Sequence, residues 1–167
     1  MTISLGEGAF VYPLAKIIRG DNLSLGEHST VDDFVYLNAG MRTVIGRYVH
    51  IGNHVSVIGG GELDIGDYAV VATGARILTA TDTFRGGARM STHLPEEYRH
   101  VVRAKVTIGV DAFVGANAVV LPGVTIPDGC VVGAGSVVTH DLEPWMVCTG
   151  APARPVRERP RPTRPGP

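Results

Sequence analysis

The sequence has no long hydrophobic run and no excess of charge of one sign, and both absences exclude classes of function. Its 15 Lys and Arg residues against 16 Asp and Glu residues give a net charge of −1, so no strong basic field exists to recruit nucleic acid or an anionic membrane. No segment approaches the ~18 apolar residues of a membrane span. The N-terminus MTISLGEGAF lacks the basic and apolar regions of a signal peptide. We therefore expect a cytoplasmic protein with no nucleic-acid or membrane partner.

Cysteine and aromatic residues are also scarce. Cys130 and Cys148 are the only cysteines. They cannot form a disulfide framework and lack the spacing of metal ligands, so we interpret them as small core residues in a reducing compartment. Aromatic residues make up 6% of the chain, whereas glycine occurs 22 times in 167 residues. The core must then be built from Val, Ile, Leu and Ala in a geometry that tolerates frequent glycine.

The sequence does contain a six-residue period. The first residue of each hexad is Ile, Val or Leu and the fifth is small or β-branched. The thirteen hexads begin at Leu25, Val31, Ile45, Ile51, Ile65, Val71, Ile77, Val102, Ile108, Val114, Val120, Ile126 and Val132. This period is neither the 3.6 residues of a helix nor the 2 residues of a simple strand, so it predicts a short strand and a bend, repeated. Three such units would make a coil of about 18 residues, and successive coils would stack at the ~4.8 Å strand spacing.

Two-residue slips interrupt the period before Ile45 and before Ile65, and two longer segments depart from it. Residues 83–101, TFRGGARMSTHLPEEYRHV, break the phase, and a long excursion from a rigid stack is more often functional than decorative. From residue 152 onward the repeat gives way to a Pro/Arg-rich tail. The sequence therefore predicts a hexapeptide-repeat domain over residues 1–151, with its excursion at 83–101, and a partly disordered tail over residues 152–167.

The hexads, together with the segment FVGANAVVLPGVTIPDGCVVGAGSVVTHDLEPWMVCTGAPAR, resemble the hexapeptide-repeat acyltransferase superfamily over roughly residues 20–157. That segment resembles the maltose, galactoside and polysaccharide-sugar O-acetyltransferases nearly throughout. Within the superfamily, ILTATDTFRGG followed by LPEEYRHV resembles a branch of sugar acetyltransferases from surface-polysaccharide clusters. The resemblance implies an all-β fold, a left-handed parallel β-helix that works as a homotrimer. A closed three-fold assembly would also cover the flat apolar faces of a single prism.

The same resemblance implies a function. It indicates an acyltransferase that uses acyl-CoA, most simply acetyl-CoA, as co-substrate and needs no metal. The acceptor would be a hydroxyl or an amine of a sugar, sugar-like molecule or nucleotide-sugar, which attacks the thioester directly. Backbone N–H groups would stabilise the oxyanion.

The resemblance also assigns cofactor residues by position. Backbone that follows a corner glycine would let the pantetheine arm approach, and a guanidinium near the end of the repeat would bind phosphate. The residues so implied are Ala116, Ala134, Thr139, His140, Pro152 and Arg154. His140 stands where the family usually has Lys, and a mostly neutral imidazole is a weaker phosphate anchor at pH 7.

Asp82 stands where enzymes of the maltose type carry a catalytic His after TAT. A carboxylate is a weaker base than an imidazole. The weaker base is a greater disadvantage for a hydroxyl acceptor, which must lose its proton as it attacks. An amine attacks with its own lone pair and loses its proton afterward. His93 could pair with Asp82 as base and orienter, and His50, near a coil corner, is a further candidate base. Arg85 and Arg89 could hold a phosphate or carboxylate of the acceptor.

Two alternatives remain open. A scaffold of a biosynthetic pathway that has lost CoA chemistry would account for Asp82 and His140. A γ-type carbonic anhydrase would need three His residues around zinc. His50 and His54 have three residues between them instead of the usual four, and no third His falls on a matching face of the coil.

Overall fold

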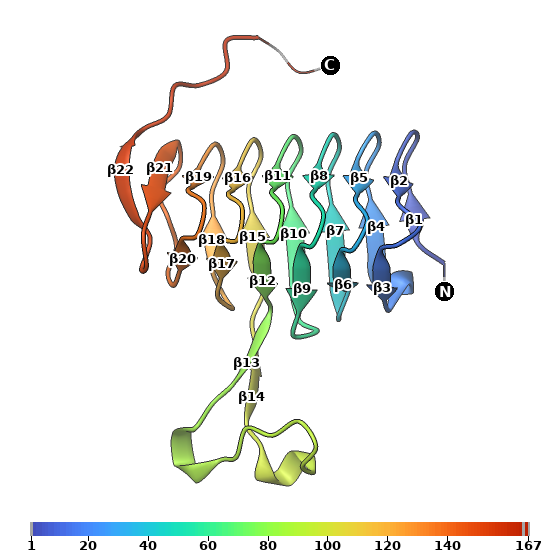
Figure 1. Ribbon diagram of the computed structural model, residues 1–167, viewed down its shortest axis with the longest axis vertical. Helices are drawn as coiled ribbons and strands as arrows, with labels where there is room; N and C mark the ends of the chain where they lie inside the picture. Colours follow the sequence, from blue (N-terminus) through green and yellow to red (C-terminus); the bar gives the residue numbers. More distant parts are fainter. Residues whose placement is uncertain (1, 165, 167) are drawn as a thin grey trace.

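The computed structural model describes residues 2–164 and 166, which form a triangular β-solenoid. Each coil contributes one short strand to each of three sheets, and successive coils stack side by side with parallel strands (Figure 1). The hexad explains this architecture, because it places one aliphatic side chain inward on each strand and a bend after it. The predicted all-β parallel β-helix is confirmed.

The three sheets follow the three faces of the prism. Sheet 1 contains β1 (Ser4–Leu5), β4 (Leu23–Leu25), β7 (Arg42–Ile45), β10 (Glu62–Ile65), β15 (Val106–Ile108) and β18 (Thr125–Ile126). Sheet 2 contains β2 (Phe10–Val11), β5 (Thr30–Val31), β8 (His50–Ile51), β11 (Val70–Val71), β16 (Phe113–Val114), β19 (Val131–Val132), β21 (Met146–Thr149) and β22 (Arg154–Glu158). Sheet 3 contains β3 (Lys16–Ile18), β6 (Tyr36–Asn38), β9 (Ser56–Ile58), β12 (Arg76–Leu78), β17 (Val119–Val120) and β20 (Val137–Val138).

Helical structure is confined, within residues 2–164 and 166, to three 3₁₀ turns. They are η1 (Gly20–Asn22), η2 (Arg85–Gly87) and η3 (Glu96–Tyr98). No helix in this part of the chain is long and apolar enough to cross a lipid bilayer.

The core is a column of the residues that the hexad predicts. All first-position residues except Val102 are at most 3% exposed, and among the fifth positions only Thr81 is exposed. Burying a Val, Leu or Ile side chain contributes about 1.5–3 kcal/mol. Repeated over every coil, this burial is the main source of stability of the prism.

Val102 and Thr81 are the two exceptions because they lie outside the prism. They pair with each other in an antiparallel ribbon of β13 (Ala80–Asp82) and β14 (Val101–Arg103). The prediction that the coil resumes at Val102 is therefore wrong: Val102 is 40% exposed, and the ladder resumes at β15. The excursion includes both ribbon strands and is longer than residues 83–101.

The Pro/Arg-rich tail begins with regular structure. β22 pairs antiparallel with β21, and Ala153 just before it is fully buried. The ordered part of the predicted tail therefore includes a strand that pairs with the prism. The predicted disorder at the very end of the tail concerns residues 165 and 167, which lie outside the described residues.

Cys130 and Cys148 lie in the core near the C-terminal end, and both are free and fully buried. Burial raises the pKa of the Cys130 thiol to about 12, and the neighbouring Cys148 raises it further. Burial likewise raises the pKa of Cys148. Their interpretation as small core residues is confirmed.

We expect both thiols to resist modification by thiol reagents in the folded protein. The thiolate is the reactive species, and a pKa of about 12 leaves about one Cys130 in ten thousand ionised at pH 8. Titration with Ellman's reagent should find no reactive thiol in native protein and two after denaturation. Because the folded state favours the neutral thiol, stability should be retained below pH 9 and fall as the pH rises toward 12. Rapid labelling of native protein at pH 8 would contradict this.

Candidate functional site

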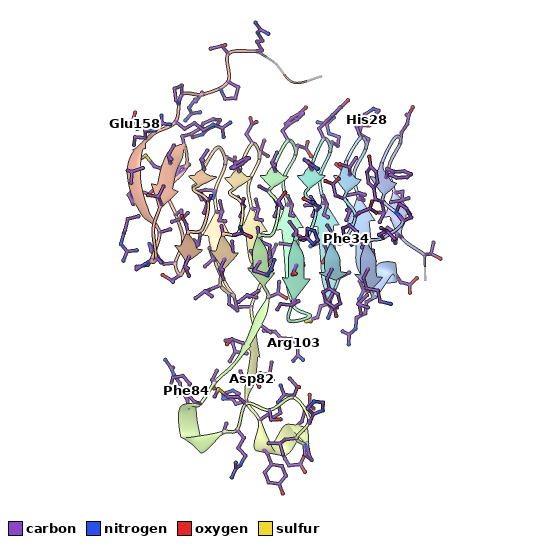
Figure 2. All side chains as sticks on the ribbon, viewed as in Figure 1. His28, Phe34, Asp82, Phe84, Arg103 and Glu158 are labelled. Carbon is purple, nitrogen blue, oxygen red and sulfur yellow. The ribbon has the colours of Figure 1, made fainter. Side chains whose placement is uncertain are left out.

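The ribbon and the loop it carries form an arm, residues 80–103, that projects from the prism at the end of β12 (Figures 1 and 2). Its base is closed by the hydrogen bond from the backbone N–H of Ala104 to the carbonyl of Thr79 at 3.0 Å. Farther out, the N–H of Thr83 donates to the carbonyl of His100 at 2.8 Å. The arm is thus an ordered element attached to a rigid body.

Asp82 lies at the outer end of β13, where Arg99 from the other side of the arm holds it. Arg99 Nε and Nη2 both donate to Asp82 Oδ1, at 3.2 and 2.9 Å. The two side chains are only 23% (Asp82) and 14% (Arg99) exposed. In the described part of the chain Asp82 Oδ2 has no hydrogen-bond partner, so one carboxylate oxygen is fixed and the other is open to a ligand.

Two hollows share Asp82. One, of about 330 Å³, is bordered by Thr92, Glu96, Arg99 and Arg103 and reaches back to Ile58 and Gly59 at the prism. The other, of about 460 Å³, is bordered by Thr81, Phe84, Arg85, His100 and Val102. Both linings combine polar or charged side chains with apolar ones, which include Val101 in the first hollow and Phe84 in the second. A carboxylate at such a junction can accept a proton from a group that reacts there.

The structure separates the other candidate catalytic residues from Asp82. His93 is exposed, and within a single chain the side chain that hydrogen-bonds to Asp82 is that of Arg99. The pairing of Asp82 with Arg99 was not predicted from the sequence. His50 lies on the prism in β8, where its Nε2 is 2.9 Å from Asp32 Oδ2.

The two arginines predicted to bind the acceptor both lie on the arm. Arg85 borders the hollow beside Asp82. Arg89 is exposed, and its backbone forms an isolated bridge with Arg99.

The predicted cofactor residues form two groups at the C-terminal coils. Ala116 and Ala134 occupy the same corner of successive coils, where the Ala116 carbonyl accepts the N–H of Gly135 at 2.8 Å. Pro152 is exposed just before the strand that carries Arg154.

Thr139, His140 and Arg154 lie in contact. Arg154 Nη1 is 2.8 Å from His140 Nε2, and Thr139 Oγ1 is 3.0 Å from His140 Nδ1. A guanidinium only donates, so the His140 ring accepts from Arg154, whose Nη1 also lies 3.3 Å from Nδ1.

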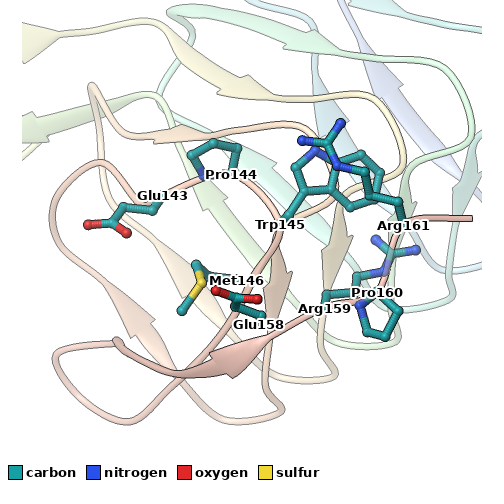
Figure 3. A pocket seen from close by; sticks show the side chains of 8 residues that line it. All are labelled: Glu143, Pro144, Trp145, Met146, Glu158, Arg159, Pro160 and Arg161. Atoms are coloured by element: carbon teal, nitrogen blue, oxygen red, sulfur yellow. The ribbon is translucent and has the colours of Figure 1, made fainter.

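A hollow of about 710 Å³ lies at the C-terminal end of the prism, beside Trp145 (Figure 3). The guanidinium carbons of Arg159 and Arg161 lie 5.6 and 4.8 Å from the centre of the Trp145 ring. Arg159 Nη1 also donates to the carbonyls of Asp111 and Gly129, at 2.5 and 3.0 Å. These contacts fasten the tail to the prism and account for the arrangement without a ligand.

Metal-binding groups do not gather anywhere in residues 2–164 and 166: no three His, Cys, Asp or Glu side chains there lie close enough to hold an ion. The rings of His50 and His54 face different neighbours, Asp32 and Phe34.

Comparison with known proteins gives consistent matches. Residues 105–140 match the family described as hexapeptide repeat of succinyl-transferase. The chain is 34% identical to a dTDP-4-amino-4,6-dideoxy-D-glucose acyltransferase of Escherichia coli, over 93% of this chain and 82% of the relative. It is 30% identical to the galactoside O-acetyltransferase of Escherichia coli K12, over 86% of this chain and 67% of the relative.

Solved structures agree with these relatives. Crystal structures of AntD, an N-acyltransferase from Bacillus cereus, superpose with a TM-score of 0.89 at 31% identity, over 95% of this chain and 84% of AntD. One AntD structure with these values contains dTDP-4-amino-4,6-dideoxyglucose and coenzyme A. Another structure of AntD, at a TM-score of 0.88 and 30% identity, contains dTDP and 3-hydroxybutyryl-CoA.

We expect the replacement Arg159→Gln to lower the free energy of unfolding by about 2 kcal/mol, because it removes charge-assisted hydrogen bonds to two backbone carbonyls. Urea unfolding followed by circular dichroism measures the change. Arg157→Gln, two residues earlier in β22 and exposed, should shift stability by less than about 0.5 kcal/mol. Equal effects of the two replacements would show that Arg159 does not fasten the tail.

Proposed function

The chain belongs to the hexapeptide-repeat acyltransferases and is an acyl-CoA-dependent acyltransferase with a sugar acceptor, and on that premise we propose that the acceptor is the amine of a nucleotide-linked amino sugar. The observation that carries this proposal is Asp82, with one oxygen held by Arg99 and the other open at the junction of two hollows. Relatives that act on dTDP-linked 4-amino sugars, similar over 93–95% of this chain, support it. The same similarity argues against a scaffold that has lost CoA chemistry.

The reaction follows from the chemistry of an amine and a thioester. The neutral amine attacks the thioester carbon, so a C–N bond forms and the C–S bond breaks. The nitrogen releases one proton to Asp82 Oδ2, and the departing thiolate of CoA takes up that proton. Arg99 acts as a positioning residue, because its two hydrogen bonds to Oδ1 fix the direction in which Oδ2 points.

Acyl-CoA would bind along the C-terminal coils. The stacked corner at Ala116 and Ala134 leaves the backbone accessible to the pantetheine arm, and Arg154, beside Thr139 and His140, would hold the phosphates at the nucleotide end, near Pro152.

The enzyme would work as a homotrimer. On the arm, Phe84, Met90 and Tyr98 are 78%, 55% and 57% exposed, an apolar surface that a second copy would cover. His50 and His93 are not in contact with Asp82, so a catalytic role for either requires a neighbouring copy to bring the groups together.

Asp82→Asn should lower kcat/KM for an amino-sugar nucleotide by about 10²–10⁴-fold, because an amide cannot take up the proton. Release of the CoA thiol, followed with a disulfide reagent, measures this rate. The dissociation constant of CoA should not change.

The matched control is Glu97→Gln, the same change of carboxylate to amide on the same arm, where Glu97 is exposed and borders neither hollow. It should keep the wild-type rate. A fully active Asp82→Asn variant, or turnover of galactosides but of no amino-sugar nucleotide by the wild type, would refute the proposal.

Arg154→Gln should weaken CoA binding about tenfold, because a charge-assisted phosphate contact is worth roughly 1.4 kcal/mol or more. Isothermal titration with CoA measures the change, and the difference from wild type should shrink at high salt. Arg157→Gln, three residues along the same strand, is the control and should bind CoA normally. Identical affinities in the two variants would remove Arg154 from the cofactor site.

A further inference from the structure

Phe34 and His54 form an exposed stacked pair at one corner of the prism. Their ring centres are 5.1 Å apart with an interplanar angle of 8°, and Phe34 is 55% exposed. Both residues have positive φ, 63° and 60°, a conformation that bulky side chains rarely adopt. At the same corner the next coils carry Gly74 and Asn117, which suit this conformation. The fold therefore does not require aromatic rings at these two positions.

The pair borders a hollow of about 450 Å³ lined by Tyr12, Asp32, Asp33, Phe34 and Asn53. Asp33 Oδ1 accepts the N–H of Leu14 at 2.9 Å. Asn53 Oδ1 accepts the hydroxyl of Thr73 at 2.7 Å. Asp33 Oδ2 and Asn53 Nδ2 have no partner within residues 2–164 and 166. The hollow thus offers a free acceptor and a free donor beside a flat aromatic surface, and it is also lined by Asp32, whose Oδ2 is 2.9 Å from His50 Nε2.

Arg76 adds a cation next to the pair. Its Nη1 donates to the carbonyls of His54 and Gly74, at 3.0 and 2.5 Å, which holds the side chain at this corner. Its Nε and Nη2 have no partner in the described chain. Two guanidinium donors that are free and close together suit a phosphate group.

We propose that this corner binds the base and diphosphate of a pyrimidine-2,4-dione nucleotide, the class that contains thymine and uracil. The base stacks on Phe34, as bases stack on aromatic side chains elsewhere. Its ring N–H donates to Asp33 Oδ2, and an adjacent carbonyl accepts from Asn53 Nδ2. Cytosine and adenine present an unprotonated ring nitrogen at that edge, which a carboxylate cannot bind.

The inference deepens the proposed function and rests on it, because the nucleotide is the carrier of the amino sugar. The AntD structures contain dTDP, a nucleotide of this class. Figure 2 shows Phe34 on the prism and Asp82 on the arm. In this proposal the base of the acceptor contacts the prism, and its amino sugar contacts the arm.

The test is isothermal titration with dTDP, UDP, CDP and ADP, with saturating CoA present so that its own site is filled. Wild type should bind dTDP and UDP and neither of the other two. Phe34→Asn removes the ring but suits the positive φ, and it should weaken dTDP binding at least about tenfold. The matched control is Tyr48→Asn, where φ is 55° and the ring stacks on Tyr68, and it should change binding by less than about twofold.

A second variant tests the edge of the base. Asp33→Asn keeps the acceptor for the N–H of Leu14 but replaces the free acceptor with a donor. It should lose dTDP and gain CDP, because cytosine presents the complementary acceptor.

Three outcomes would overturn the inference. They are a wild type that binds neither dTDP nor UDP, a Phe34→Asn variant with wild-type affinity, and dissociation of the assembly by Phe34→Asn in light scattering, which would make the ring pair a contact between copies. Failure of the proposed function gives a different result: wild type binds dTDP but acylates no amino-sugar nucleotide. Acylation with an unchanged KM in Phe34→Asn is the kinetic form of the second outcome, because it leaves the function intact and refutes the base site alone.

Discussion

The contact of each inward aliphatic side chain with the equivalent side chain of the next coil holds this molecule together. In sheet 1 the register places Leu25 opposite Ile45, then Ile65, Ile108 and Ile126, all buried. No single coil can bury its own column, so stability arises between neighbours. The coils must also approach closely at the corners. A Cβ added at Gly26 would lie 2.5 Å from the backbone of Gly46, closer than atoms can pack.

The stacked aliphatic side chains fill the interior of the prism, so the residues proposed to react or to bind ligands lie on its outside. The arm leaves after β12 without disturbing the ladder, since Arg76 still pairs with Val119 and Leu63 with Val106 on the next coil. An insertion at a corner therefore leaves the strand pairing and the packing of the core unchanged. It places Asp82 and Arg99 on an ordered ribbon that the rigid body holds in position.

The sequence predicts the parts of the fold that repeat and misses those that depend on a single partner. The first coil is absent from the thirteen hexads, although Leu5, Val11 and Ile17 are six residues apart. A terminal coil has one neighbour only, and Leu5 is 51% exposed, so the hydrophobic signal weakens there. Val102 keeps the six-residue phase by coincidence while pairing in the ribbon. Periodicity alone cannot distinguish these cases.

In the candidate site too, the sequence identifies one residue but not the partner that holds it. Asp82 stands out by its place after TAT, but its partner Arg99 is 17 residues away and meets it only through the antiparallel register of the arm. β22 was missed because its composition suggests disorder. The exposed edge of β21 outweighs composition, since an unpaired strand edge favours pairing with any adjacent extended segment.

The nature of the base bears on which acceptor the site suits. The proton of a hydroxyl must leave while the oxygen attacks, which calls for a base as strong as an imidazole. An amine attacks with a lone pair that is already free, and its N–H protons become strongly acidic only once the C–N bond has formed. A carboxylate such as Asp82 can take up a proton at that stage. The replacement of imidazole by carboxylate at this place in the sequence therefore favours transfer to nitrogen over transfer to oxygen, on a scaffold whose relatives include enzymes of both kinds.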